Sequence, residues 1–287
     1  MVGDPGHGIM SYGTVAISGG HLTINAGGSG IVSDGTVTVT ADAIINVDSA
    51  YVGIQASDFI MADNYLGAPT IKIDPVDSAI VTVKNQYTYI YDSSIDEDCN
   101  YSLHVTNTDV SNNFYSYGGT LTTLMDIYTV HSVILRSGPN DSYIKKEFKY
   151  KGIGHGISAK GAIYIDSGHV QINGPDIDDM IPVQYTTEFL VNKLATVIIS
   201  GVDTTDTSFP KYGDCAFIRT GRSITWDAGT ELKINTAEGN PIYRGTLVNA
   251  GSFLVVAHPE FTARRDYEVY LNENRYVLTA YNPIGGT

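Results

Sequence analysis

The chain has 287 residues, of which 43% are hydrophobic, and its 31 acidic and 17 basic residues give a net charge of −14. This content is ample for a packed core and excludes a disordered chain. The acidic balance argues against nucleic acid as a partner, and no apolar run approaches the length needed to cross a membrane. The two cysteines, Cys99 and Cys215, could form a disulfide, but two thiols indicate no compartment.

Two distant stretches, from Gly6 to Asn25 and from Gly154 to Asn173, have nearly the same sequence. They read GHGIMSYGTVAISGGHLTIN and GHGISAKGAIYIDSGHVQIN. Gly-Ile pairs also recur at Gly8, Gly30 and Gly53, at almost equal intervals. An interval of about 22 residues is the length of one winding of a right-handed parallel β-helix.

Within each copy, apolar residues lie two apart, in pairs separated by Gly, Asn, Asp or Ser. This spacing is typical of short strands with one inward face, and the helical spacings of three and four are absent. One winding cannot bury its apolar face alone, so the windings must stack around a common core. We expect Gly13, Gly35 and Gly161 at the bends, with backbone angles that a side chain would resist.

We therefore predict an all-β fold, a right-handed parallel β-helix with an irregular insertion and a C-terminal hairpin cap. The expected regions are first coils over residues 1–64, an irregular insertion or tyrosine-rich coils over 65–151, further coils over 152–258, and a cap over 259–287.

The cap and one possible helix are the remaining predicted elements. The residues from Asp266 to Tyr281 alternate around Asn272-Glu273-Asn274, which predicts a hairpin that closes the C-terminal end. The segment Thr186–Leu194 is the one helical candidate in the chain.

The repeat resembles the β-helical carbohydrate-binding domains of secreted bacterial proteins. The pattern that carries the resemblance is GHGI-x3-G-x-[VI]-x-I-x2-GH-[LV]-x-IN, over about residues 6–62 and 152–175. The resemblance implies the pectate-lyase fold without its chemistry. It also implies an extracellular protein that binds an acidic polysaccharide, often with calcium.

Polygalacturonases, which are also β-helices, offer a second and partial resemblance. They carry Asn-Thr-Asp, Asp-Asp, Gly-His-Gly and Arg-x-Lys in that order. Here Asn107-Thr108-Asp109 and Gly154-His155-Gly156 are present, but the Asp pair between them is missing and no Arg-x-Lys follows His155. Inverting hydrolysis needs an acid and a base on opposite faces of the sugar. We therefore expect no catalytic residues, with a depolymerase, either hydrolase or lyase, as the alternative.

An acidic cluster in the second half of the chain is the candidate calcium site. It comprises Asp176, Asp178 and Asp179 in Gly-Pro-Asp-Ile-Asp-Asp. In an extended segment Asp176 and Asp178 would point the same way and could bind calcium through oxygen. A solvated loop is the other interpretation.

A group of tyrosines is the candidate carbohydrate site. Tyr87, Tyr89 and Tyr91 alternate in QYTYIYD, and Tyr115 and Tyr117 follow in NNFYSYGG. Alternate residues of a strand share a face, so these rings could form a flat platform for sugars. The same tyrosines could instead belong to the core or to a subunit interface.

Polar residues that match between the repeats are expected to be structural. His7 matches His155 and His21 matches His169, which favours turn residues over metal ligands. A set of asparagines, each of which follows an apolar strand residue, predicts a ladder of stacked amides along the windings. Its members are Asn25, Asn46, Asn173 and Asn235.

The N-terminus shows neither the segments of a secretory signal nor a polar cap before the repeat begins. We expect that the chain was cut from a larger protein or that another subunit covers this end. The leading hypothesis is a non-catalytic extracellular protein that binds polysaccharide or a cell-surface glycan within an assembly of other copies or neighbouring subunits. A virion or tail appendage fits, because phage structural proteins need no signal. The alternatives are a depolymerase and a purely structural assembly protein.

Overall fold

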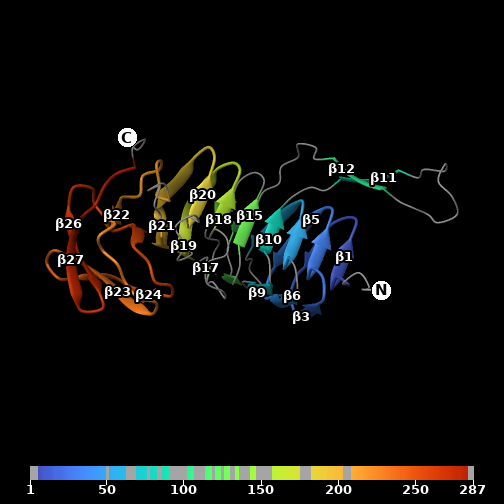
Figure 1. The fold of residues 1–287 in the computed structure, drawn as a ribbon, viewed down its shortest axis with the longest axis horizontal. Helices are drawn as coiled ribbons and strands as arrows, with labels where there is room; N and C mark the ends of the chain where they lie inside the picture. Colours follow the sequence, from blue (N-terminus) through green and yellow to red (C-terminus); the bar gives the residue numbers. More distant parts are fainter. Residues whose placement is uncertain are drawn as a thin grey trace.

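The computed structural model shows an elongated stack of β-strands that ends in a separate cap at the C-terminal side (Figure 1). Every regular element in the described part of the chain is a β-strand. The described residues are 6–49, 52–62, 69–75, 78–82, 86–90, 102–106, 114–117, 120–123, 126–129, 133–135, 143–146, 157–174, 182–202 and 208–283.

Three parallel faces form the stack. The first is a seven-stranded sheet in the order β1 (Ile9–Ser11), β4 (Ile31–Ser33), β7 (Ile54–Ala56), β10 (Ser78–Thr82), β15 (Asp126–Thr129), β18 (Ile157–Ala159) and β20 (Val183–Tyr185). The second contains β2 (Val15–Ile17), β5 (Thr36–Thr40), β8 (Asp58–Ala62), β13 (Phe114–Tyr117) and β16 (Val133–Leu135). The third contains β3 (His21–Ala26), β6 (Ile44–Ser49), β9 (Thr70–Pro75), β14 (Thr120–Thr123) and β17 (Tyr143–Lys146).

Two long strands join the second and third faces. Strand β19 (Ile163–Asn173) pairs with β16 through its first residues and with β17 through its last, so it turns the corner between the faces. Gly168, with φ of 93°, lies within this strand, at an angle that L side chains rarely adopt. Strand β21 (Phe189–Gly201) pairs with β19 in parallel along both parts.

The register confirms the predicted stacking of successive windings. Ile9 pairs with Ile31 and Ile31 pairs with Ile54, as the Gly-Ile period predicts. The same row continues through residues 80, 127, 157 and 183. Ile31 and Ile54 are completely buried. Because each inward side chain lies on its equivalent in the next winding, the chain is a parallel β-helix.

At Gly30 and Gly35, glycine is needed for close approach rather than for an unusual backbone angle. A Cβ on Gly30 would lie 2.6 Å from the carbonyl oxygen of Gly53, in the next winding. Gly13 and Gly35 do not have positive φ, so the predicted bend angles are wrong at these positions. The bend angle expected at Gly161 is wrong as well, because this residue has no positive φ. Instead, a Cβ on Gly35 would lie 2.9 Å from the backbone of Gly13.

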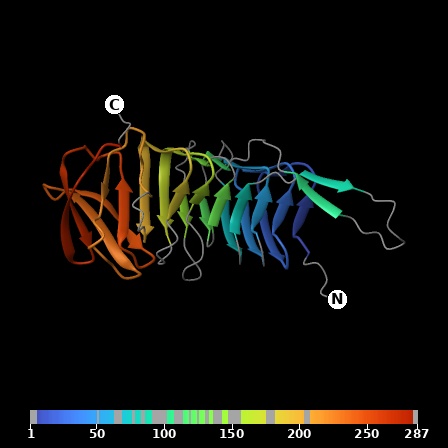
Figure 2. The ribbon, with the colours of Figure 1, turned by 45° about the horizontal axis from the view of Figure 1, so that its top comes forward.

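Residues 65–151, predicted as an irregular insertion or as coils, contain both. Strands β9, β10 and β13 to β17 extend the three faces in register. Strands β11 (Gln86–Ile90) and β12 (Ser102–Thr106) instead form an antiparallel two-stranded sheet that stands apart from the stack (Figure 2). These windings contain no Gly-Ile pair, so the repeat could not be recognised in their sequence.

Among the named strands, parallel pairing ends with β21, and beyond it one isolated parallel bridge joins Leu190 to Tyr212. The coils were predicted to continue to residue 258. The helix predicted over Thr186–Leu194 is wrong, because Phe189 and Val191 alternate into the solenoid core as strand residues. The last part of β21 pairs antiparallel with β25 (Phe253–Ala257), which also pairs with β22 (Phe217–Arg219).

Strand β25 is a wall between two cores. All five of its residues are buried. Phe253, Val255 and Ala257 belong to the solenoid core, whereas Leu254 and Val256 belong to the core of the cap. The strand therefore has an apolar side chain on both faces, which an isolated or half-exposed strand would not have.

The cap also contains a four-stranded antiparallel sheet. Its order is β24 (Pro241–Leu247), β23 (Thr230–Thr236), β26 (Asp266–Leu271) and β27 (Asn274–Thr279). The predicted C-terminal hairpin is therefore confirmed as β26 and β27, and it is half of a larger sheet.

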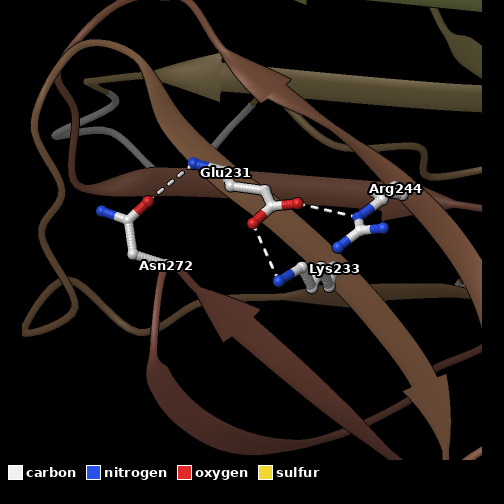
Figure 3. A network of polar contacts seen from close by, with 4 residues as sticks. All are labelled: Glu231, Lys233, Arg244 and Asn272. Atoms are coloured by element: carbon white, nitrogen blue, oxygen red, sulfur yellow. Dashed lines mark hydrogen bonds and ion pairs between the residues drawn. The ribbon is translucent and has the colours of Figure 1, made fainter.

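Polar contacts at the hairpin turn attach it to β23 (Figure 3). Asn272 has φ of 52°, which asparagine tolerates in a turn. Its N–H donates to the Glu231 carbonyl at 2.8 Å, and its Oδ1 accepts from the Glu231 N–H at 2.9 Å. The Glu231 carboxylate contacts Lys233 Nζ at 2.8 Å and Arg244 Nε at 2.7 Å. These bonds, that from Lys233 first, lower the pKa of Glu231.

Cys215 is a free and buried thiol. Burial, with a smaller contribution from the charge of Asp214, raises its pKa to about 12, so the thiol is neutral near pH 7. Cys99, the other cysteine, lies outside the described residues.

The first winding is less covered than those behind it. Its inward residue Ile9 is only partly buried, whereas Ile31 in the next winding is completely buried. The same partial burial holds for Val15, Ile17 and Leu22. Met10 and Tyr12 are 56% and 71% exposed. Among the described strands, none pairs with the outer edge of β1, β2 or β3.

The stacking generates a prediction for glycine substitutions. We expect Gly30→Ala to lower the free energy of unfolding by about 1–3 kcal/mol, because the new methyl would press against the Gly53 backbone. Chemical denaturation followed by circular dichroism measures the change. Gly13→Ala is the matched control, since nothing lies within 4 Å of its Cβ position. Equal destabilisation by both substitutions would contradict the close-approach explanation.

Candidate functional site

The structure places the candidate tyrosines in two different sheets. Tyr87 and Tyr89 belong to β11 in the separate hairpin. Tyr115 and Tyr117 belong to β13 in the second face of the solenoid, where Tyr115 pairs in register with Ile60. Tyr91 lies outside the described residues. A shared platform of all five tyrosines stays a prediction.

The predicted metal and catalytic motifs fall outside the described part of the chain. This applies to Asp176, Asp178 and Asp179, and equally to Asn107-Thr108-Asp109 and Gly154-His155-Gly156. Within the described ranges, no three His, Cys, Asp or Glu side chains are grouped so that they could hold a metal ion. Calcium binding by the aspartates stays a prediction.

The repeat-matched histidines His21 and His169 are strand residues of β3 and β19, so their prediction as turn residues is wrong. The Nδ1 of His7 accepts the backbone N–H of Ser29 at 3.1 Å, so this residue ties one winding to the next. His21 and His169 lie in one row of the third face, which the register follows through residues 44, 70, 120 and 143. Their equivalent repeat positions are thus confirmed.

The predicted asparagine ladder is wrong. For Asn25 and Asn46 to share a row, the two residues would have to pair with each other across strands β3 and β6. Asn25 pairs instead with Asp48, whereas Asn46 pairs with Thr23 on one side and Lys72 on the other. The two asparagines therefore occupy neighbouring rows.

These neighbouring rows line a groove of about 350 Å³ on the third face, across strands β3, β6 and β9. One row is Thr23, Asn46 and Lys72, and the other includes Asn25 and Asp48. All five side chains are exposed. Ile24 and Val47 alternate with them, point into the core and are 5% and 2% exposed. The alternation of the strands therefore holds the polar groups outward on a rigid floor.

The groove offers both donors and acceptors of hydrogen bonds. The two asparagine amides supply each kind, Lys72 only donates, and the Asp48 carboxylate only accepts. Side chains in one row lie about 4.8 Å apart, the spacing of adjacent strands. The site can therefore bind a ligand that presents hydroxyl groups at intervals along its length.

The first row stays polar toward the cap. Beyond Lys72 the register continues through Thr122, Lys145 and Gln171. Strand β24 then covers it, because Gln171 is only 4% exposed and its Nε2 donates to the Thr246 carbonyl at 2.9 Å. The cap thus marks the end of the polar track.

The Ile-Asn dipeptides in the sequence point to the two asparagines, but they do not indicate Thr23, Lys72 or the groove itself. The interval from Gly30 to Gly53 would have been the signal, because the same interval carries Thr23 onto Asn46. The shared Ile-Asn dipeptide instead suggested that Asn25 is equivalent to Asn46, which the register does not support.

No family model matches this chain, and neither a curated protein nor a solved structure shows significant similarity to it. The described residues contain no helix long and apolar enough to pass through a bilayer.

Two histidines lie where the cap meets the solenoid. The His169 ring stacks on Tyr243 of β24, with centroids 6.0 Å apart and planes at 18°. Burial lowers the pKa of His169, and the nearby charge of His258 lowers this pKa further. Burial also lowers the pKa of His258, and the Glu260 carboxylate opposes that shift. Burial therefore favours the neutral form of both imidazoles in the folded protein.

This burial predicts a loss of stability in mild acid. Because both pKa values are lowered on folding, the unfolded chain binds more protons once the pH falls below about 6.5, and the free energy of unfolding decreases. We expect a lower melting temperature at about pH 5.5 than at about pH 7.5, measured by scanning calorimetry.

The control for this prediction comes from the repeat. His169→Gln should weaken the dependence on pH, whereas His21→Gln, in the same row but exposed, should leave it unchanged. An identical dependence in both variants would contradict the assignment to His169.

Proposed function

We propose that this chain is a non-catalytic β-helical protein that binds a polysaccharide in the groove along β3, β6 and β9. The observation that carries the proposal is the set of exposed polar residues that repeats from winding to winding: Thr23, Asn25, Asn46, Asp48 and Lys72. A linear glycan repeats its hydroxyl groups along its length, and matched positions of a solenoid repeat their side chains along its axis. The repeated hydroxyl groups of the glycan can therefore form hydrogen bonds with the repeated polar side chains of the groove.

Charge favours a neutral polysaccharide for this groove. Asp48 lies among the lining residues, and the chain carries a net charge of −14. A polyanion would be repelled by this field, whereas neutral hydroxyl groups are little affected by it. The resemblance to the carbohydrate-binding domains of secreted proteins supports a polysaccharide ligand and an extracellular location. It implies an acidic polysaccharide, so the preference for a neutral one rests on the charge of this chain alone.

Variants of the groove test the proposal. We expect the double substitution Asn46→Ala and Lys72→Ala to weaken binding to soluble neutral glucans by about tenfold or more, because each lost hydrogen bond contributes about 1 kcal/mol. Affinity gel electrophoresis measures the binding. Gln55→Ala, which changes a polar residue of β7 on another face, is the matched control and should bind as the native chain does.

The outcome of this test separates the alternatives. Absence of retardation by every glucan, or an equal loss in the Gln55→Ala control, would count against the groove. Release of new reducing ends or unsaturated products would favour a depolymerase, and we expect neither product.

Assembly is a second candidate function, favoured by the first winding. Ile9, Val15, Ile17 and Leu22 are only partly buried there, and Met10 and Tyr12 are exposed at the rim. Exposed aromatic and sulfur-containing side chains are typical of subunit interfaces. We infer that Met10 and Tyr12 contact a neighbouring subunit, as in a virion or tail appendage.

Light scattering coupled to size exclusion tests the assembly. We expect the native chain to form oligomers, and the double substitution Met10→Ser and Tyr12→Ser to shift it toward the monomer. Leu194→Ser is the control, because Leu194 is 76% exposed but lies on the last winding. A native chain that is monomeric at all concentrations would contradict this function.

A further inference from the structure

A second pocket, far along the chain from the groove, is formed by the cap. It has a volume of about 380 Å³, near the lower end of the range for small-molecule sites. Its lining comes from the turn after β22, from β27 and the residues that follow it, and from Phe253 of β25. None of its lining residues belongs to the groove along β3, β6 and β9.

Backbone hydrogen bonds hold the walls of the pocket in place. The Thr220 N–H donates to the Leu254 carbonyl at 3.0 Å, and the Thr220 hydroxyl accepts from the Leu254 N–H at 3.0 Å. On the other side, Phe217 and Tyr281 exchange two backbone bonds of 3.0 and 2.8 Å. Leu254 and Phe217 are buried in the two cores, so the walls of the pocket are attached directly to both.

The charged side chains that line the pocket are both arginines, Arg219 and Arg222. The Arg219 guanidinium lies over the Phe209 ring, 5.0 Å from its centroid, and Phe209 stacks on Phe217 at 5.8 Å. This contact orients the guanidinium before a ligand binds. The side chain therefore loses less conformational entropy on binding. Each arginine has five N–H donors, so one guanidinium can contact a protein group and a ligand at the same time.

An exposed apolar surface lies beside the arginines. Val277 and Tyr281 line the pocket and are 55% and 52% exposed, which places them among the large hydrophobic side chains most open to solvent. The Tyr281 ring can cover the flat face of a ligand. The pocket thus combines two guanidinium groups with a ring-sized apolar wall.

Charge in the chain is divided in a way that favours an anion at this end. Residues 1–207 contain nine basic and 23 acidic residues, which accounts for the whole net charge of −14, whereas residues 208–287 contain eight of each. One carboxylate bonds to a lining residue, since the Thr279 hydroxyl donates to Asp266 Oδ1 at 2.6 Å. Asp266 keeps its negative charge but is not a lining residue, so the charged side chains of the lining itself are the two arginines.

We infer that the cap pocket binds the carboxylate of a ring-sized organic acid, with the acid group on Arg219 and Arg222 and the ring against Tyr281. A planar guanidinium matches a carboxylate through two parallel hydrogen bonds. The acid can be a sugar acid or a non-sugar cyclic acid, because both present the same carboxylate on a ring of similar size.

Calorimetric titration of the full chain tests this site. The probes are galacturonate, cyclohexanecarboxylate, neutral galactose, acetate and inorganic phosphate. We expect millimolar binding of at least one ring carboxylate, weakening with added salt, and at least about tenfold weaker binding of galactose and acetate. The tighter of the two ring acids identifies the source of the ligand.

Variants assign the binding to the pocket. Arg222→Gln should weaken it by about tenfold or more, and the exposed position of Arg222 in a turn makes the change compatible with folding. Arg219→Gln is the second variant. Arg244→Gln, which removes an exposed arginine of the cap sheet that contacts Glu231, is the matched control.

Three results would overturn the inference. They are the absence of binding by either ring acid, equal affinity for acetate or phosphate, and unchanged affinity in both arginine variants. Binding of neutral glucans by the groove should not change in Arg222→Gln, so failure at one site is distinguishable from failure at the other.

Discussion

In-register stacking of inward apolar side chains is the interaction on which the rest of the structure depends. Because side chains alternate along a strand, the register that buries Ile31 on Ile54 also aligns the outward rows. A slip of one residue would turn the polar rows of the third face into the core. The stack ends at β25, whose alternate residues enter two cores and whose antiparallel pairing covers the edge of the last winding.

The fold was predictable because the repeat records the contacts between windings. Gly30 recurs where a Cβ would strike the backbone of the next winding, and Ile31 recurs where the core must be filled. Both requirements are local to each winding, so they leave a period in the sequence. The hairpin around Asn272 was equally predictable, since the alternation of apolar and polar residues and one turn residue specify it without partners distant in sequence.

The sites were less predictable because they depend on the register between strands. Asn25 and Asn46 look equivalent in sequence, but the register of the third face pairs Asn46 with Thr23 and Asn25 with Asp48. The cap pocket joins β22, β25 and β27, which are distant in sequence and carry no shared motif. Likewise β21 resembled a helix until its pairing with β19 fixed the strand period.

The uneven distribution of charge has a consequence for how the molecule approaches its surroundings. All of the net charge of −14 is carried by residues 1–207, whereas the cap, residues 208–287, carries none. An anionic surface therefore repels the cap less than it repels the rest of the chain. At physiological ionic strength this difference acts only within about 8 Å of such a surface, at the last stage of an encounter.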